Sequence, residues 1–455
     1  MKGSEHVVTP EGWLSRGEAF VRGDGAQLAV LGGIPGERVR VRVTSSQGHV
    51  HRARFIAPAG KPHADRVAPS CERWATCGRC SWMHLTVPAQ QAHRRRALME
   101  AFDGLDVPLE VVPVEAGAVH TLELHAGTSD EGRLRLGVLG REGGLVAIPA
   151  CEVATPTLRE IMKVTAFNLI DMQIRPWRRG GAFRGVRARQ SMHTGEVMLT
   201  LVFARAVPFA RELVERIAGG VQEVRGAHAH WNDADEALVP DTGETTPIYG
   251  NPTLDEQFGD IRVRLAPVDA WPVTTAERDA WLAVGDALDP QKGDAVLEMG
   301  SGVGARTTRA AAASGWALGV DDDVGRVERA RADAARSGFE AEFAHVLDAA
   351  EWTTVLARLD GRRPRVMADT GTRGLDDEAV ARIVGSVPRR VVLLGSNPRA
   401  MARDVRALAR GGLLPRSVRA WPILPHQPHL SMVAVLDHPD EAPPERRAPR
   451  RTRVR

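Results

Sequence analysis

The sequence predicts a multidomain α/β protein in which a small β-barrel, a mixed central domain and a doubly wound parallel sheet follow one another. The chain has 455 residues, which is too many for one hydrophobic core. Residues 1–60 consist of short strand-like runs broken by glycine, and residues 105–265 alternate strand and helix signals. From about residue 266 onward the pattern becomes strand–helix repeats, which are typical of a parallel sheet.

The N-terminal segment predicts a barrel with one basic face. In the run VRVRV, Val39, Val41 and Val43 alternate with arginines, so the apolar side chains take one face of the strand and the guanidinium groups take the other. A surface that contacts RNA and an ordinary solvated strand face are the two interpretations. The formal net charge of +3 does not decide between them.

The four cysteines carry the sharpest signal for a bound group. Cys71, Cys77 and Cys80 lie in the stretch CERWATCGRC, and Cys151 follows much later in IPACEVATP. Thiolates at this spacing can converge from one loop on a soft metal or a cluster, and the distant cysteine then fastens a later segment to that loop. A disulfide pair and unrelated small core residues are the alternatives, although nothing in the sequence signals export. The spacing alone does not separate iron–sulfur from zinc.

A second candidate site lies in the C-terminal repeats. The stretch AVLEMGSGVGARTTRAAA predicts a strand, a glycine turn and a helix. Gly300, Gly302 and Gly304 allow a tight turn and let a ligand approach the start of the helix. Asp321 ends the next strand 19 residues after Gly302, a separation at which an acidic side chain meets ribose hydroxyls. A nicotinamide-binding domain and a glycine turn without a ligand are the rival interpretations.

The cysteine stretch also carries a family resemblance. RVAPSCERWATCGRCSWMHL and the helix QQAHRRRALMEAF resemble the iron–sulfur loop of the uridine-C5 RNA methyltransferases, in which a cysteine, five residues and CGxC precede a QHL-like triplet. The resemblance implies that the four cysteines hold a four-iron four-sulfur cluster, and that IPGERVRVRV belongs to a TRAM domain, an OB-like RNA-binding module. The domains that it implies are TRAM at 1–60, the cluster loop and helix at 61–104 with Cys151, a central domain at 105–265, a methyltransferase domain at 266–440 and a disordered basic tail at 441–455.

For the C-terminal domain the resemblance implies a class I S-adenosylmethionine site. It assigns Gly300 to the methionine loop, Asp321 to the ribose and Asp348 to the neighbourhood of the adenine. Asp369, at the end of the strand RVMAD, takes the position on the fourth strand beside the methyl donor. The implied partner is ribosomal or transfer RNA with the target base flipped out. Because no run of about 18 apolar residues occurs, we expect a soluble cytoplasmic protein without a membrane segment, acting as a monomer.

The sequence departs from this family where the chemistry takes place. The nucleophile motif SCNPxTLARD reads GSNPRAMARD here, so Ser396 stands in place of the catalytic cysteine. The base segment PHxxHxE reads PHQPHLS, so Ser431 replaces the glutamate, and the donor-binding glutamine of FFQxN aligns with Pro272. In this family a thiolate adds to C6 of uracil before methyl transfer, and a serine hydroxyl is far less acidic than a thiol. The sequence therefore predicts no 5-methyluridine by the family's route.

Several functions remain open on the sequence alone. The first is an RNA-binding protein of this S-adenosylmethionine-dependent family. The others are a noncatalytic or regulatory paralogue, and methyl transfer to a nitrogen or oxygen acceptor, for which no C6 adduct is needed. The retained acids of the donor site favour donor binding, whereas the substituted catalytic positions favour the paralogue. His426 and His429 lie near the base position in sequence and are either a substitute base or structural histidines.

Overall fold

The structure is a computed structural model that describes residues 2–441 apart from 24, 130, 131, 133, 142, 143, 234–237 and 239–244. The chain forms two compact units. The first consists of Met1–Ala97, Val111–Asp279 and Trp421–Ser431, and the second of Leu98–Glu110, Ala280–Ala420 and Met432–Arg455. The predicted basic tail lies, from residue 442 on, outside the described residues. Within the described part of the chain, no helix has the length and apolar character needed to cross a bilayer.

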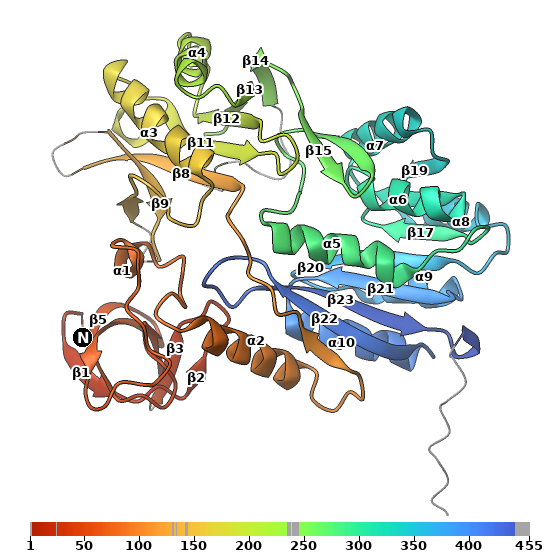
Figure 1. The fold of residues 1–455 in the computed structure, drawn as a ribbon, viewed down its shortest axis with the longest axis horizontal. Coiled ribbons are helices and arrows are strands. Elements are labelled where there is room, and N and C mark those ends of the chain that lie inside the picture. Colours follow the sequence, from red (N-terminus) through yellow and green to blue (C-terminus); the bar gives the residue numbers. More distant parts are fainter. Residues whose placement is uncertain are drawn as a thin grey trace, which may run out of the picture. The chain divides into compact units, whose positions relative to one another are not determined.

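The first unit begins with a curled six-stranded sheet (Figure 1). Its strands are β1 (Glu5–Val8), β2 (Gly12–Trp13), β3 (Ala19–Gly23), β4 (Ala26–Leu31), β5 (Val39–Gln47) and β6 (Val50–Pro58), in the order β1-β5-β6-β4-β3-β2. Val39, Val41 and Val43 are buried, and the arginines between them are exposed. The alternation predicted from the sequence is confirmed, because successive side chains of a strand point to opposite faces.

The cluster loop and the central sheet follow. The loop carries the short helix α1 (Trp74–Cys77) and leads into α2 (Val87–Ala101). The central sheet has the order β10-β9-β8-β11-β12-β13-β14. Its elements are β8 (Thr121–Thr128), β9 (Leu134–Leu139), β10 (Leu145–Ala147), α3 (Pro156–Asp171), η1 (Trp177–Arg179), β11 (Phe183–Gln190), β12 (Val197–Phe203), α4 (Ala210–Gly220), β13 (Val224–Trp231) and β14 (Thr245–Gly250). Apolar residues of α3 and α4 pack against the sheet and form the largest core of this unit, and a hairpin of β15 (Leu254–Phe258) and β16 (Ile261–Leu265) comes next.

The second unit is built on an eight-stranded sheet of order β19-β18-β17-β20-β21-β23-β22-β7. The strands are β7 (Leu109–Val111), β17 (Val296–Met299), β18 (Ala317–Asp321), β19 (Ala341–His345), β20 (Arg365–Gly371), β21 (Arg390–Gly395), β22 (Leu414–Pro422) and β23 (Leu430–Asp437). The helices are α5 (Thr275–Leu288), α6 (Ala305–Ser314), α7 (Val324–Ser337), α8 (Ala349–Ala357), α9 (Asp377–Gly385), α10 (Pro398–Arg410) and η2 (Pro439–Glu441).

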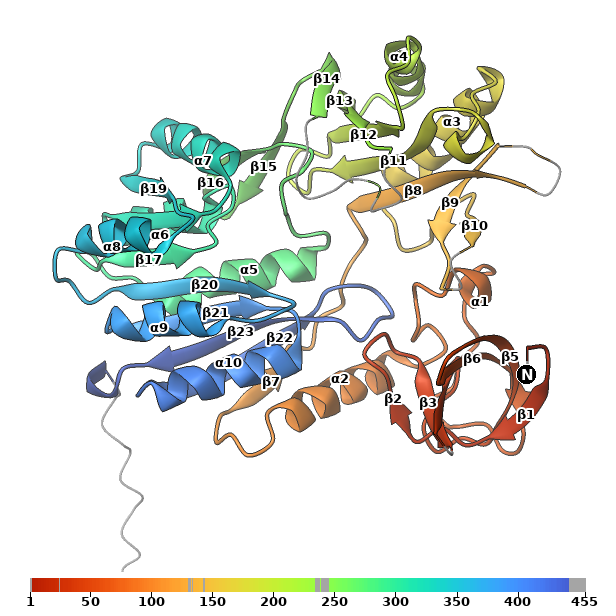
Figure 2. The ribbon, with the colours of Figure 1, turned by 180° about the vertical axis from the view of Figure 1, so that it is seen from behind.

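The strand order of this sheet indicates where a ligand would bind. Strands β19, β18, β17, β20 and β21 are parallel, whereas β23 runs antiparallel to β21 (Figure 2). An all-parallel dinucleotide-binding sheet of order 3-2-1-4-5-6 has no such inserted antiparallel strand, so the sheet departs from the nicotinamide alternative. The order reverses between β17 and β20, and ligands of doubly wound sheets bind at the carboxyl ends of the strands beside this reversal. The predicted fold class is confirmed.

Candidate functional site

The glycine loop between β17 and α6 has the open geometry that a ligand needs. Gly300, Gly302 and Gly304 have φ angles of 74°, 54° and 78°, a region in which side chains are strained. A Cβ on Gly302 would meet no atom within 4 Å, whereas a Cβ on Gly304 would lie 2.6 Å from the ring of Phe343. Gly304 therefore lets α6 pack closely on the sheet, and the space beside Gly302 stays open at the start of the helix.

Asp321 is fixed beside this loop by three hydrogen bonds. Its carboxylate accepts from the backbone N–H of Gly302 at 2.8 Å, from the N–H of Asp323 at 3.0 Å and from Arg326 Nη1 at 3.2 Å. The side chain is almost fully buried, and burial raises its pKa. An ionised carboxylate has about four acceptor positions, so room remains for one donor such as a ribose hydroxyl.

Asp348 has a structural role at the start of a helix that the sequence analysis did not consider. Its side chain caps α8 by accepting from the backbone N–H of Glu351 at 2.9 Å, and the Glu351 carboxylate in turn accepts from the backbone N–H of Asp348 at 3.4 Å. This capping box satisfies amide groups that the first turn of a helix leaves without partners. Asp348 is exposed at the carboxyl end of the sheet, and its assignment to the adenine stays a prediction.

Sequence reasoning missed a chain of charged side chains below the glycine loop. Glu298 in β17 is fully buried, and its carboxylate accepts from Arg306 Nε at 2.6 Å and from the hydroxyl of Thr307. The same guanidinium approaches Asp369 at the end of β20, with 3.5 Å between Nη2 and Oδ2. Arg306 Cζ also lies 4.7 Å from the ring centre of Trp281. The available signal was one acid in an apolar strand, eight residues before an arginine.

The electrostatics of this chain hold the acid of the fourth strand toward the loop. Burial raises the pKa of Glu298, and its ion pair with Arg306 acts in the opposite direction. Burial favours loss of the Arg306 proton, but the two carboxylates outweigh that effect and raise the pKa of Arg306. Asp369 is therefore tied to a charged residue of α6 and is only partly exposed.

Ser396, the residue at the nucleophile position, follows β21. Its hydroxyl donates to the backbone carbonyl of Gly371 at 3.4 Å, and its N–H donates to the same oxygen at 2.9 Å. Across the described residues, no imidazole or carboxylate is hydrogen-bonded to this hydroxyl. A serine becomes a nucleophile when an adjacent base takes its proton, so the geometry leaves Ser396 unactivated.

The residues that the nucleophile motif retains have structural contacts. Asn397 caps α10 by accepting from backbone N–H groups, and its amide donates to the carbonyl of Thr372 at 3.0 Å. Asp404 accepts from the N–H of Leu375 at 2.9 Å, and Arg403 donates to the carbonyl of Leu375 at 3.0 Å. These hydrogen bonds hold the loop after β20 in place. This structural role is enough to explain why Asn397, Arg403 and Asp404 are retained.

The positions predicted near the base lie in the first unit. Ser431 is 3% exposed within β23, and Pro272 is buried before α5. His426 has a φ of 54°, and its Nδ1 lies 3.2 Å from the side-chain amide nitrogen of Gln90 in α2. Burial lowers the pKa of His426 and of His429, so both are neutral at neutral pH. The contact with Gln90 favours the structural interpretation of His426.

The four predicted ligands approach one another in the first unit. Cys77 ends α1, and Gly78 caps this helix with a φ of 65°, which turns the chain toward Cys80. Cys71 and Cys80 pack against one small apolar cluster, whereas Cys77 and Cys151 pack at the edge of the central core. The local fold thus packs the loop against the segment that follows β10, through Val153 beside Cys71 and Cys80.

The thiols also interact electrostatically. Burial, together with repulsion from the other three sulfur atoms, raises the pKa of Cys80 to about 12. Burial raises the pKa of Cys77 and of Cys151 as well, again with contributions from neighbouring thiols. Over the described ranges of the chain, no group of three or more His, Cys, Asp or Glu side chains has the geometry to hold a metal ion. The bound cluster therefore stays a prediction.

Comparison with known proteins shows which proteins the chain resembles. No family model matches it. It is 24% identical over 451 residues to an uncharacterized RNA methyltransferase of Caldanaerobacter subterraneus, covering 96% of this chain and 98% of that protein. It is 26% identical over 438 residues to the 23S rRNA (uracil(1939)-C(5))-methyltransferase RlmD of Aeromonas hydrophila, covering 91% and 92%. A solved structure, the Pyrococcus abyssi tRNA (uracil-54, C5)-methyltransferase in complex with S-adenosyl-L-homocysteine, matches with a TM-score of 0.73 at 20% identity, over 95% of this chain and 100% of that chain.

The chain is thus similar, over nearly its whole length, to RNA methyltransferases, one of which is named for C5 of a ribosomal uracil, and it shares its fold with a tRNA uracil-C5 methyltransferase. The glycine loop, Asp321 and Asp369 lie together at the carboxyl edge of the sheet, and their role in binding a donor stays a prediction. Ser396 lies at the end of the neighbouring strand, in contact with the loop after β20. The structure adds Glu298 and Arg306 below the loop, which the sequence analysis did not single out.

Proposed function

We propose that this chain is a member of the uridine-C5 RNA methyltransferase family that binds RNA and S-adenosylmethionine but makes no 5-methyluridine through the family's covalent adduct. The observation that carries the proposal is the position of Ser396. Its hydroxyl is engaged with the Gly371 carbonyl and contacts no base among the described residues. Addition to C6 of uracil needs an anionic nucleophile, and a serine hydroxyl without a base remains protonated at neutral pH. Ser431 likewise has no carboxylate with which to remove the C5 proton.

Donor binding is supported by the loop geometry. The space beside Gly302 is open, and the Asp321 carboxylate keeps acceptor capacity for a ribose hydroxyl. The relative of known structure was solved with S-adenosyl-L-homocysteine, the product of methyl donation. When bound, S-adenosylmethionine supplies an electrophilic methyl group. The residues of this chain bind and orient the donor, and Arg306 holds the Asp369 carboxylate close to the loop.

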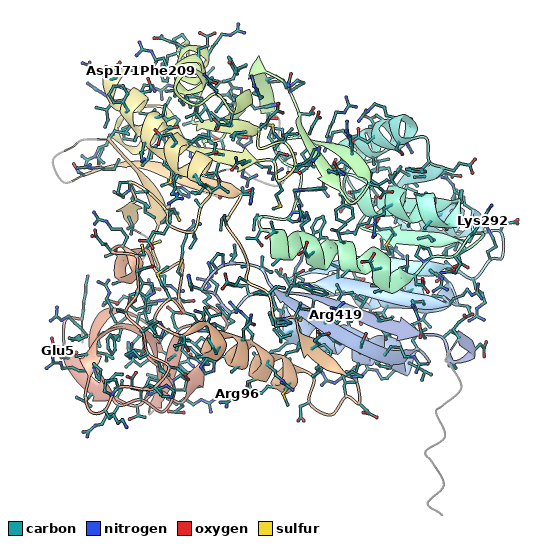
Figure 3. All side chains as sticks on the ribbon, in the orientation of Figure 1. Glu5, Arg96, Asp171, Phe209, Lys292 and Arg419 are labelled. Atoms are coloured by element: carbon teal, nitrogen blue, oxygen red, sulfur yellow. The ribbon has the colours of Figure 1, made fainter. Side chains whose placement is uncertain are left out.

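RNA binding is supported by the exposed face of β5. Arg40 and Arg42 are both more than half exposed, and such groups attract phosphate. Glu5 on the neighbouring strand lies 2.6 Å from Arg42 and on the outside of the curled sheet, where it offsets part of this charge (Figure 3). The free positive charge is therefore modest, which favours shape and several weak contacts over one strong basic patch.

We infer that Cys71, Cys77, Cys80 and Cys151 hold the four-iron four-sulfur cluster. The fit rests on the donor set, because four partly buried thiols that repel one another when ionised are stabilised as thiolates by a cationic group between them. The bound cluster would neutralise these thiolates and fasten the Cys151 segment to the loop. Metal analysis of protein purified without oxygen tests this: about four irons per chain are expected, and stoichiometric zinc without iron would overturn it.

The experiment that tests the function is mass spectrometry of nucleosides from ribosomal and transfer RNA, with and without the gene. We expect 5-methyluridine to be unchanged by deletion. Loss of 5-methyluridine from one RNA, restored by the wild-type gene, would contradict the proposal. Loss of a different methylated nucleoside would favour methyl transfer to a nitrogen or oxygen acceptor.

A further inference from the structure

A single arginine joins the cysteine loop to the curled sheet. Arg141 lies in the turn between β9 and β10, and all of its partners belong to the first unit. Its Nε donates to the carbonyl of Gly78, the glycine inside the CGRC motif. Its Nη2 donates to the carbonyl of Arg16 at 3.1 Å, and its Nη1 lies 3.0 Å from the carboxylate of Glu18. One guanidinium thus contacts two separate parts of the chain, the CGRC motif and the segment that runs from Arg16 to Glu18.

The CGRC motif leaves space for this guanidinium at Gly78. A Cβ on Gly78 would lie 2.6 Å from Cδ of Arg141, and the positive φ of Gly78 also disfavours any side chain there. The Arg141 side chain is 18% exposed, and that of Glu18 is 6% exposed. A planar guanidinium can meet a carboxylate and two carbonyl groups at once, which an ammonium group on a flexible stem does poorly.

The charge of Arg141 is not cancelled by its carboxylate partner. Glu18 is shared with Arg52, whose Nη1 lies 2.9 Å from the same oxygen atom. Two guanidinium groups and one carboxylate leave one net positive charge at this junction. That charge sits against the backbone between Cys77 and Cys80, two of the four expected ligands. Net charge and hydrogen bonding around a cluster are among the factors that set its reduction potential.

We propose that Arg141 positions the CGRC loop and that its positive charge stabilises the reduced state of the cluster held by that loop. The inference rests on the proposed iron–sulfur cluster. Adding an electron to a group surrounded by four thiolates is favoured by a nearby cation, because the attraction grows with the negative charge of the cluster. Loss of the Arg141 charge therefore lowers the midpoint potential, and loss of its carboxylate partner raises it.

The test is an anaerobic redox titration of the iron-loaded, full-length protein, followed by visible absorbance and electron paramagnetic resonance. Arg141→Gln is expected to shift the reduction equilibrium toward the oxidised cluster by about tenfold, which is about 59 mV for a one-electron couple. Glu18→Gln is expected to shift the potential in the opposite direction, which a purely structural role would not produce. Arg135→Gln removes a charge from the exposed face of β9 and is expected to match the wild type.

Arg141→Lys separates charge from geometry. Arg141→Lys keeps the positive charge but loses the planar guanidinium that contacts several partners at once. We therefore expect a midpoint potential close to that of the wild type, and faster loss of iron in air. Equal potentials in the iron-loaded wild type, Arg141→Gln and Glu18→Gln would overturn the role of Arg141 and leave the cluster proposal intact. Wild-type protein that binds zinc instead of iron would overturn the cofactor proposal, and the redox role with it. If Arg141→Gln fails to retain iron, the midpoint potential of Glu18→Gln tests the proposal: a raised potential supports it, and an unchanged potential overturns it.

Discussion

Removal of the Arg306 side chain tests the charged chain below the glycine loop. In Arg306→Met the fully buried carboxylate of Glu298 loses its cation and keeps only the hydroxyl of Thr307. Breaking a buried ion pair by deleting one partner costs about 3–5 kcal/mol. For a unit of this size, about 2–4 °C of melting temperature corresponds to 1 kcal/mol, so we expect a fall of roughly 10 °C in thermal unfolding followed by circular dichroism.

The loss of stability in Arg306→Met should depend on pH. Burial raises the pKa of Glu298, and without Arg306 only the hydrogen bond from Thr307 opposes that effect. The folded state of Arg306→Met then binds more protons than the unfolded state, so its stability is present at low pH and is lost as pH rises through the raised pKa. The melting temperature of Arg306→Met relative to the wild type should therefore be least affected near pH 5 and most affected near pH 8.

Two further variants sharpen the comparison. Glu298→Gln/Arg306→Met removes both charges, and we expect it to recover much of the lost stability and to lose the pH dependence. Arg309→Met is the matched control, because Arg309 lies on the same helix but pairs at 2.8 Å with the exposed Asp286, and such surface pairs contribute about 0–1 kcal/mol. Equal melting temperatures for Arg306→Met and Arg309→Met at every pH would refute the reasoning.

The other predictions concern the donor, the loop and the cysteines. Asp321→Ala is expected to weaken S-adenosylmethionine binding about ten- to a hundredfold in calorimetry, and an unchanged affinity would count against the site. Asn397→Ala removes the cap of α10 and should cost about 1 kcal/mol in thermal unfolding, with Arg399→Ala as the control; equal melting would contradict the assigned cap. Cys151→Ser is expected to lower the iron content of anaerobic protein, and full iron content would exclude Cys151 as a ligand.

The sequence predicted those parts of the fold that depend on local pattern. The alternation at Val39, Val41 and Val43 gave the buried face of β5, because strand geometry has a period of two. The glycine loop and Asp321 were found in the same way, since a turn that needs positive φ angles must be built from glycine. Each feature depends on residues that are close together in the sequence or a fixed number of positions apart.

The missed contacts have no such pattern. Arg141 and Gly78 are 63 positions apart and meet only because the β9–β10 hairpin folds back over the cluster loop. Asp348 was assigned to the adenine because its position matched the family, although the run DAAE from Asp348 to Glu351 is a capping-box signature that predicts its role at the start of α8. Glu298 was visible as an acid in an apolar strand. Its partner on α6 follows only from the packing of helix on sheet.

The most direct test of the central claim is a covalent-trapping assay with RNA that contains 5-fluorouridine, which holds the C6 adduct that the family's route requires. Wild-type protein is expected to form no adduct, because no base among the described residues is bonded to the hydroxyl of Ser396, and Ser431 has no carboxylate to serve as the base. The Ser396→Cys/Ser431→Glu variant is the positive comparison, in which a regained adduct would show that the uridine pocket has been kept. An adduct formed by the wild-type protein, and lost in Ser396→Ala, would contradict the account.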